Sequence, residues 1–473
     1  MRSVTPMRAA KVGYIVMSAL FCVLGAVLLI WPDVSVRWIG RLLGIGMLIF
    51  GEARPAANEV LAGKPSVTTR SGELSLSFLS DVSDYIADRF AFRQELATAW
   101  AGVNARLLGT SVEEQVILGS DGWLYFSDTL PDYMGQGMSD AELRYLANDL
   151  ALMQEYIESQ GKQFAFTIAP NKNSIYPEHM PDYIENRHGE SNAARIGAYL
   201  DTAGVNYLDL FEILGSEENL YYKTDTHWNS RGAALAADGL LNLLDRGGDY
   251  SAASFATAEN HRGDLYEMLY PAGRAVETAP AYDGELSYIC ESDPNGGKAI
   301  TIKTVCDAGT DGLMCWRDSF GIALYPYLAQ SFAAATFSRS ADYDLTLANS
   351  ADAVIIELVE RNLSNILSRT PTFPAPAREL PSAASVGTIA VDSDEAKTDA
   401  MADYVRVSGE LGAYMLDSGS RVYIAAGDTA YEAYICTSSD SDTLRFFAWI
   451  PAGEEAHQVI TTLNSEYTAY QIS

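Results

Sequence analysis

Short apolar runs alternate with helix-like segments between residues 139 and 358, and this alternation constrains the fold of the chain most strongly. Ser139 and Glu142 have the spacing of a capping box, and apolar residues then recur at helical spacing until Gly161. The predicted strands are 164–169, 205–210, 313–316 and 353–358, and further helices are predicted over 192–203, 233–244 and 322–332. Strands that alternate with helices predict an α/β fold, a doubly wound parallel sheet with ligands at the carboxyl ends of its strands.

Changes in composition predict five consecutive parts of the chain. Residues 1–51 are largely apolar, as in a membrane anchor, and 52–80 are polar and mixed, which is typical of a linker. The α/β domain is expected to cover 81–370. Prolines then mark a second linker over 371–384. Residues 385–473 contain short β-rich segments separated by Gly, Asp and Ser, which predict a small all-β module.

The N-terminal part contains one clear candidate for a transmembrane segment. Residues 12–31 carry no charge and are long enough to cross a bilayer, and Arg2, Arg8 and Lys11 before them favour a cytoplasmic N-terminus. A cleaved signal peptide is the alternative, but the run is long for one and lacks a clear small-x-small exit. A second apolar stretch, 38–51, either crosses back or lies at the interface. We favour an arrangement in which this stretch lies at the interface or packs on the first helix, because positive charge is concentrated before the first span. The bulk of the protein is then outside the cytoplasm at the cell membrane.

Charge and cysteine content narrow the function further. Asp and Glu number 62 against 32 Lys and Arg, giving a net charge of −30, so nucleic acid is an unfavourable partner. Cys290 and Cys306 flank a polar, Gly-rich turn and are a candidate disulfide in an extracytoplasmic domain. No cysteine or histidine group has the spacing of zinc ligands, so we expect neither a metal nor a cofactor.

Two short segments combine residues that could carry out acyl transfer. Asp225 stands two residues before His227, where a carboxylate can hold an imidazole in one tautomer and stabilise its protonated form. Ser319 stands between a predicted strand and a predicted helix, where backbone N–H groups could stabilise an oxyanion. A serine at that place is by default a helix N-cap, and a single histidine is more often structural. The interpretation therefore depends on the combination of the two segments.

The same segments carry a family resemblance. Residues 225–228 (Asp-Thr-His-Trp), followed by 317–321 (Arg-Asp-Ser-Phe-Gly), resemble the DHHW family and the related alginate O-acetyltransferases AlgJ and AlgX, which are SGNH-hydrolase-like proteins. The resemblance covers roughly residues 80–370. Further matching blocks occur in the family's order at 119–126, 169–172, 176–178 and 359–361. The resemblance implies an SGNH-like fold with Ser319 as nucleophile, His227 as base and Asp225 as the residue that orients it. Position 226 is Thr where the family name has His, as happens in the alginate enzymes.

Other residues are candidates for the same cleft. Asn171 is a candidate oxyanion donor, with a simple turn residue as the alternative, and Lys172 follows it. Arg317 and Arg361 could orient a carboxylate or an acyl donor, or pair with structural acids. Trp228 is interpreted as a packing residue, with sugar stacking as the alternative. The other histidines have no partner pattern and are interpreted as ordinary surface residues: His179, His188, His261 and His457.

We therefore expect a membrane-anchored, extracytoplasmic O-acyltransferase that acetylates a cell-surface or secreted polysaccharide through an acyl-enzyme on Ser319. The resemblance also implies a membrane-bound O-acyltransferase partner that supplies the acyl group. A carbohydrate esterase would use the same residues with water as the acceptor. A non-catalytic glycan-binding or envelope-assembly protein would keep Ser319 and His227 as structural residues. Glycan binding by the C-terminal module stays open, because that module resembles a carbohydrate-binding module only in placement and class.

Overall fold

The computed structural model describes two compact units of the chain. The described residues are 60–68, 72–88, 93–292, 297, 299–340, 342–395, 398–412, 415–417, 419–437, 443–464 and 466–473. The first unit comprises the described residues up to Glu113 together with Tyr266–Arg274, and the second comprises Glu114–Leu265 and Ala275–Ser473. The candidate chemistry lies in the second unit.

The first unit is helical. It contains α4 (Phe78–Asp88) and α5 (Arg93–Val103), which continues into a π-helical turn over Asn104–Leu108. No helix among the described residues is long and apolar enough to cross a membrane. The predicted span 12–31 and the second apolar stretch 38–51 lie outside the described residues.

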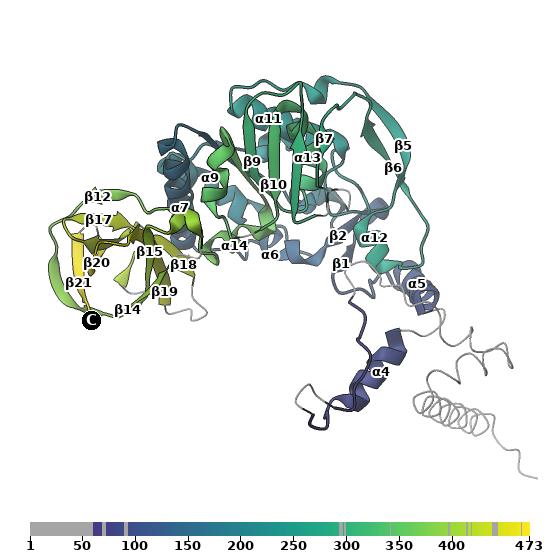
Figure 1. The fold of residues 1–473 in the computed structure, drawn as a ribbon. Helices are drawn as coiled ribbons and strands as arrows, with labels where there is room; N and C mark the ends of the chain where they lie inside the picture. The colour runs from purple at the N-terminus through teal and green to yellow at the C-terminus, as the bar shows by residue number, and fades with distance from the viewer. Residues whose placement is uncertain are drawn as a thin grey trace, which may run out of the picture. The chain divides into compact units, whose positions relative to one another are not determined.

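The second unit is built on a seven-stranded sheet with the order β4-β3-β11-β9-β10-β8-β7 (Figure 1). Its five parallel strands are β3 (Gln163–Ala169), β4 (Tyr207–Leu208), β9 (Gly312–Trp316), β10 (Ala334–Ser338) and β11 (Ala353–Val359). An antiparallel edge adds β8 (Thr301–Val305) and β7 (Ile289–Cys290). The predicted α/β fold with its parallel sheet is confirmed, whereas this antiparallel edge was not predicted from the sequence.

Helices cover both faces of this sheet because the central strands bury alternate side chains on opposite sides. Phe164, Phe166, Met314 and Trp316 belong to one hydrophobic core, and Ala165, Leu313 and Cys315 belong to the other. The first core includes buried side chains of α7 (Asp140–Ser159), α9 (Asn192–Ala203) and α14 (Ser364–Leu367). The second includes those of α10 (Leu210–Gly215), α11 (Ser230–Leu243) and α13 (Gly321–Ser331). The predicted capping box of α7 is present, with Ser139 and Glu142 bonding reciprocally.

The C-terminal region is β-rich, as predicted. One sheet contains β12 (Ala377–Glu379), β17 (Thr429–Glu432), β16 (Val422–Ala426), β20 (Ala456–Leu463), β21 (Glu466–Ile472) and β13 (Ala384–Ile389). The other contains β14 (Val391–Glu395), β15 (Tyr404–Gly412), β19 (Thr443–Pro451) and β18 (Tyr434–Thr437). Strand β12 lies within the predicted proline-rich linker. A small separate hairpin, β5 (Phe255–His261) with β6 (Glu277–Tyr282), lies in the α/β part of the unit.

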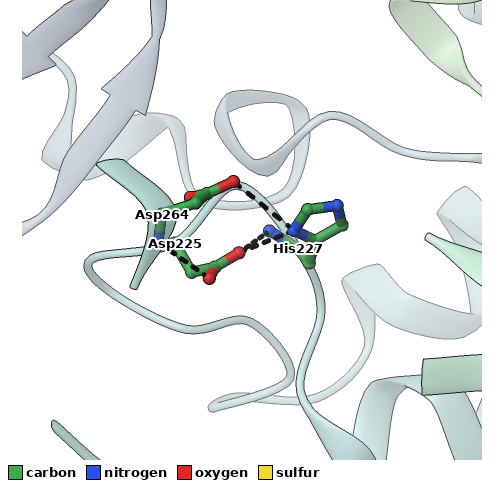
Figure 2. A group of neighbouring side chains, drawn as sticks. All are labelled: Asp225, His227 and Asp264. Atoms are coloured by element: carbon green, nitrogen blue, oxygen red, sulfur yellow. Dashed lines mark hydrogen bonds and ion pairs between the residues drawn. The ribbon is translucent and has the colours of Figure 1, made fainter. Parts of the chain in front are cut away.

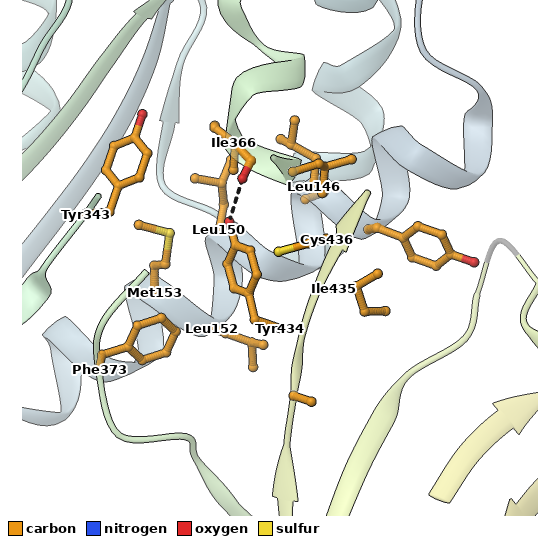
Figure 3. Packing of buried hydrophobic residues seen from close by; sticks show 14 of the residues in the cluster. Leu146, Leu150, Leu152, Met153, Tyr343, Ile366, Phe373, Tyr434, Ile435 and Cys436 are labelled. Carbon is orange, nitrogen blue, oxygen red and sulfur yellow. Dashed lines mark hydrogen bonds between the residues drawn. The ribbon is translucent and has the colours of Figure 1, made fainter. Parts of the chain in front are cut away.

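The β-rich region shares a hydrophobic core with helix α7 (Figure 3). Tyr434 and Ile435 of β18 belong to the same buried cluster as Leu146, Leu150 and Met153 of α7. Polar bonds extend this contact. Arg378 of β12 donates to both carboxylate oxygens of Glu155 at 2.6 and 2.5 Å and to Glu432 at 2.9 Å. The side chain of Asp149 on α7 accepts a hydrogen bond from the Ile435 backbone N–H at 3.1 Å.

The expected disulfide is not formed. Cys290, Cys306, Cys315 and Cys436 are all free thiols in the part of the chain that the structure describes. The register of β7 against β8 places Cys290 opposite Thr304, so Cys290 and Cys306 are not cross-strand partners. The predicted disulfide was wrong, because the pairing of β7 with β8 does not place the two cysteines opposite each other.

The buried acid Asp149 should make the stability of this unit depend on pH. Burial raises the pKa of Asp149 well above its ordinary value, so the folded state binds a proton that the unfolded state releases above about pH 4. The contribution of Asp149 to stability is therefore greatest below that pH and falls as pH rises toward the folded pKa. Asp149→Asn does not titrate, so its free energy of unfolding should gain on wild type by up to about 1.4 kcal/mol per pH unit. Denaturant unfolding between about pH 5 and about pH 8 measures this, with the exposed Asp201→Asn as control.

Candidate active site

The loop that carries Asp225 and His227 closes on itself before helix α11. The Asn229 backbone N–H donates to the Leu220 carbonyl at 2.8 Å, and Tyr221 and Trp228 form an isolated antiparallel bridge. The Asn229 side chain caps α11 by accepting from the N–H groups of Arg231 and Gly232 at 3.0 and 3.3 Å. The base of the loop is therefore fixed by the same residue that starts the helix.

Asp225 and His227 interact directly (Figure 2). His227 Nδ1 lies 2.6 Å from Asp225 Oδ1, and the His227 backbone N–H donates to the same oxygen at 2.9 Å. Burial disfavours a charged Asp225, but hydrogen bonds and charge from His227 and His261 outweigh it and hold the pKa of Asp225 well below its usual range. An ionised Asp225 fixes the tautomer with the proton on Nδ1, which leaves His227 Nε2 as an acceptor.

A second carboxylate, Asp264, flanks the histidine. Asp264 Oδ2 lies 3.6 Å from His227 Nδ1 and accepts from Thr226 Oγ1 at 2.5 Å, and Asp264 Oδ1 accepts from the Thr226 N–H at 2.8 Å. Burial alone would lower the pKa of His227, but the Asp225 hydrogen bond and the charges of both carboxylates raise it above the ordinary value of 6.5. Thr226 thus links the second carboxylate to the loop.

Within the described part of the chain, Asp225, His227 and Asp264 form a group of side chains that could hold a metal ion, since their ligand atoms all lie within 4.8 Å of one another. Each of their four carboxylate oxygens already accepts a hydrogen bond from the protein. His227 Nδ1, the nitrogen nearest these oxygens, points at Asp225. The arrangement orients an imidazole, and a cation would have to displace these bonds to enter.

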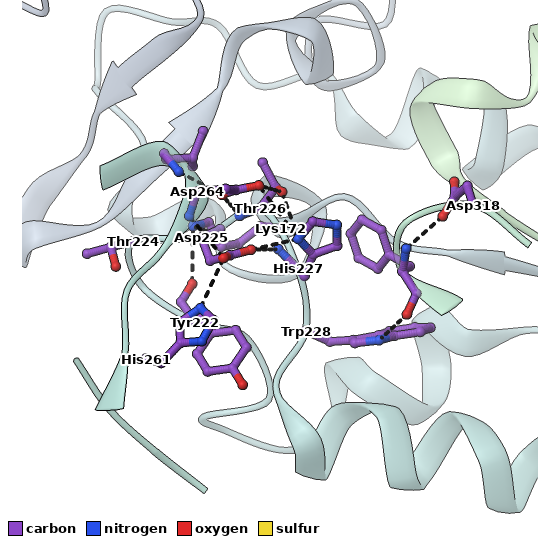
Figure 4. A network of polar contacts seen from close by, with 12 residues as sticks. Lys172, Tyr222, Thr224, Asp225, Thr226, His227, Trp228, His261, Asp264 and Asp318 are labelled. Atoms are coloured by element: carbon purple, nitrogen blue, oxygen red, sulfur yellow. Dashed lines mark hydrogen bonds and ion pairs between the residues drawn. The ribbon is translucent and has the colours of Figure 1, made fainter. Parts of the chain in front are cut away.

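Lys172 lies beneath the loop instead of lining a cleft, which corrects the sequence-based expectation (Figure 4). Its Nζ donates to the backbone carbonyls of Tyr222, Lys223 and Asp225 at 3.1, 2.9 and 2.5 Å. Burial lowers the pKa of Lys172 to about 8, against the opposing charges of nearby acids. The lysine satisfies three carbonyls of an irregular segment and so fixes the position of Asp225.

The other candidate side chains also form contacts with groups of the protein itself. The Asn171 side chain is fully buried, donates to Asp132 Oδ2 at 3.3 Å and accepts from Arg361 at 3.4 Å, so its amide is not presented as an oxyanion donor. Arg361 is half-buried, and its guanidinium lies over the rings of Phe126 and Phe320, 5.4 and 5.7 Å from their centroids. Arg317 is buried and donates to backbone carbonyls, those of Asp318, Gly297 and Ala299.

Trp228 is a packing residue, and this interpretation is confirmed. Its side chain is fully buried, and its Nε1–H donates to the Phe320 carbonyl at 3.0 Å. The two rings meet edge to face with centroids 5.1 Å apart. A buried indole offers no face for a sugar, so the stacking alternative is excluded.

Ser319 occupies the turn between β9 and α13 and is partly exposed. It is not the N-cap of α13, whose cap residue is Phe320 without a side-chain cap bond. Asp318 braces the turn: its Oδ1 accepts from the Phe320 N–H at 2.8 Å, and its Oδ2 accepts from the Val359 N–H at 2.7 Å. The default expectation of a capping serine therefore fails, and the Ser319 hydroxyl is not used to start the helix.

The turn with Ser319 and the loop with His227 are neighbours. The Phe320 ring lies 4.8 Å from the His227 ring, centroid to centroid. His227 Nε2 is buried and has no hydrogen-bond partner among the described residues, so no bond to Ser319 Oγ is formed in this structure. Catalytic hydrogen bonds are often long or absent without substrate, and the base atom is available here.

Sequence reasoning missed Asp264 of this site and misjudged two histidines, His261 of the site and His179 outside it. His261 Nε2 lies 3.0 Å from Asp225 Oδ2, so His261 is not an ordinary surface residue, and Asp264 lies beside it. His179 is also not ordinary, since its ring stacks on Trp123 with centroids 4.6 Å apart and its Nδ1 lies 3.0 Å from Ser120 Oγ. These contacts join segments that are far apart in sequence, so the spacing of neighbouring residues does not predict them.

Part of the sequence is similar to known proteins. Residues 116–288 match the family model described as the SGNH hydrolase-like domain of acetyltransferase AlgX. Over 216 residues the chain is 28% identical to the probable alginate O-acetylase AlgJ of Pseudomonas syringae pv. tomato, which covers 44% of this chain and 49% of that protein. Part of this chain is therefore similar in sequence to AlgX and AlgJ. The matched model includes Asp225 and His227 and ends before Ser319.

Solved structures give weaker likenesses. PatB1 of Bacillus cereus is 17% identical with a TM-score of 0.41 over 52% of this chain and 97% of that one. The O-acetyltransferase domain of Pseudomonas putida AlgJ is 19% identical with a TM-score of 0.35 over 52% and 91%. The chain spans about half the length of the AlgJ relatives that it matches.

Lys172 should be essential for the position of the loop. Lys172→Met keeps most of the apolar stem but leaves three carbonyls without their donor, which should cost about 3 kcal/mol of unfolding free energy. Amide hydrogen exchange should rise within 222–227. The exposed neighbour is a matched control, because Lys223→Met should change stability by less than about 0.5 kcal/mol. Equal effects of the two substitutions would contradict a structural role for the buried ammonium.

Proposed function

We propose that this protein is an SGNH-like O-acetyltransferase in which Ser319, His227 and Asp225 form a catalytic triad. One observation supports this most directly: Asp225 Oδ1 lies 2.6 Å from His227 Nδ1, while Nε2 is buried beside the turn that carries Ser319 and has no hydrogen-bond partner in the described part of the chain. A histidine oriented in this way is a base without its proton donor. The similarity to AlgJ and AlgX supports an acetyltransferase role at the level of the family.

In the proposed reaction, Ser319 Oγ attacks the acetyl carbonyl of the donor as His227 Nε2 takes the hydroxyl proton. Asp225 stabilises the imidazolium that results. The proton then passes from Nε2 to the leaving group, and acetyl-Ser319 remains. A hydroxyl of the acceptor attacks this ester while Nε2 takes its proton, and that proton returns to Ser319 Oγ as the acetylated product leaves.

We propose a polysaccharide as the acceptor, because the curated relatives are named alginate O-acetylases. A membrane-bound O-acyltransferase as acyl supplier, anchoring through residues 12–31 and an extracytoplasmic active site complete the proposal. Water as acceptor would make the same triad an esterase. The two activities differ only in which hydroxyl reaches the acyl-enzyme.

The raised pKa of His227 fixes the expected pH dependence of acetyl transfer. The base must be neutral, so activity should fall as pH drops through a value above 6.5, the ordinary pKa of histidine. Asp225→Asn removes the charge and the fixed tautomer and should lower kcat on the order of 10³-fold or more. Steady-state rates across pH measure both effects. Asp128→Asn, at an exposed carboxylate, is the control and should leave the profile unchanged.

The nucleophile is tested by trapping the acyl-enzyme. Wild-type protein incubated with an acetyl donor such as p-nitrophenyl acetate should gain one acetyl group on Ser319, seen by mass spectrometry of the intact chain and of its peptides. Ser319→Ala should gain none at that site, and Ser368→Ala, at an exposed serine, should behave as wild type. An acetyl group on the active-site peptide of Ser319→Ala would sink the assignment. Adding oligosaccharide then separates transfer from hydrolysis by the ratio of acetylated sugar to free acetate.

A further inference from the structure

We propose that His261, the last residue of β5, is a positioning residue of the candidate triad. We further propose that the β5–β6 hairpin holds the loop that carries Asp225 and His227 in place. This inference rests on the proposed function for its catalytic meaning. The contacts themselves do not depend on that function. They involve groups that neither the family resemblance nor the sequence pattern assigned to the site.

The Asp225 carboxylate is held by four donors, two on each oxygen. Oδ1 accepts from the backbone N–H and Nδ1 of His227, at 2.9 and 2.6 Å. Oδ2 accepts from His261 Nε2 and from the Asp264 backbone N–H, both at 3.0 Å. The first pair comes from the loop of Asp225 itself. The second pair comes from the last residue of β5 and from the residues just after that strand, so among the described residues this segment links the carboxylate to a part of the domain outside its own loop.

The hairpin contacts the loop at more than one point. His261 and Glu277 are opposite each other in the β5–β6 ladder. Glu277 accepts from the backbone N–H groups of Lys223 and Thr224 at 2.7 and 3.0 Å. Between these contacts, Gly263 approaches so closely that a Cβ there would lie 2.1 Å from the Thr224 carbonyl oxygen. A glycine is required at this approach, which indicates that the hairpin and the loop are built to dock.

His261 is itself held in place. Its ring stacks on Tyr222 with centroids 3.6 Å apart and an angle of 11° between the planes (Figure 4). The backbone carbonyl of Tyr222 is one of the three that Lys172 holds. The imidazole is therefore fixed between its stacking partner and Asp225, and its Nε2 carries a hydrogen toward Oδ2 because the carboxylate is an acceptor only.

The two histidines share one carboxylate, and this has an electrostatic consequence. A donor on Oδ2 withdraws negative charge from the oxygen that bonds His227, so it moderates how strongly Asp225 favours protonated His227. The charged groups that face His227 are Asp225, Asp264 and Arg361. Removal of the His261 donor leaves these in place and should increase the basicity of His227 while allowing the carboxylate to turn.

Two substitutions separate the hydrogen bond from the stack. His261→Phe keeps an aromatic ring against Tyr222 and removes the donor. His261→Gln places an amide N–H near the position of Nε2 and removes the ring. Imidazole titration followed by ¹⁵N NMR on the full chain needs no substrate. The pKa of His227 should rise by about 0.5 to 1 unit in the Phe variant and stay within about 0.2 unit of wild type in the Gln variant.

Acetyl transfer gives the second readout. The Phe variant should lose about tenfold in kcat with KM nearly unchanged, its acidic limb should move to higher pH, and the Gln variant should recover most of the rate. An unchanged His227 pKa in a folded Phe variant overturns the proposal, as does a Gln variant no better than Phe. Should the Phe variant not fold, His261→Asn, whose amide falls short of Oδ2, is measured in its place. If the wild type shows no transfer activity but the His227 pKa still rises in the Phe variant, the proposed function is refuted and the role of His261 in holding Asp225 stands.

Discussion

A nearly buried carboxylate organises the candidate site. Removing the Asp225 side chain from water costs free energy unless hydrogen bonds replace the lost hydration, and the structure supplies donors to both oxygens. Because these donors come from the loop and from the hairpin beside it, satisfying one charge also fixes two segments of backbone. The orientation of His227 is a consequence of that compensation. The loop has no regular secondary structure that could position the ring by itself.

Lys172 compensates the buried negative charge of Asp225 and also bonds to the backbone of the loop. An irregular loop leaves backbone carbonyls without partners, and a buried ammonium that donates to three of them replaces the ladder that a strand would provide. Burial makes the charged lysine unfavourable, while the acids around Asp225 favour it. The positive charge beneath the loop and the ionised carboxylate within it thus stabilise each other, and neither group is free to bind substrate.

The sequence predicted what depends on local pattern. The alternating segments, the capping box of Ser139 and Glu142, the spacing of Asp225 and His227 and the packing role of Trp228 all follow from a few neighbouring residues. The sequence did not reveal the roles of His261, Asp264 and the β5–β6 hairpin. Their contacts with Asp225 and its loop join residues that are far apart in the chain, so they exist only in the folded structure. Asn171 and Arg317 were misjudged for the opposite reason. They stand next to strand ends, as site residues do, but their side chains turn into the interior.

Phe320 connects packing with chemistry. Its carbonyl accepts from the Trp228 indole, its ring covers His227, and its own N–H is held by Asp318. Since Phe320 directly follows Ser319, the contacts that bury the histidine ring also determine where the serine stands. The Phe320 ring also shields one side of the imidazole from water, so the side chain that follows Ser319 shapes the surroundings of the base as well as the course of the turn.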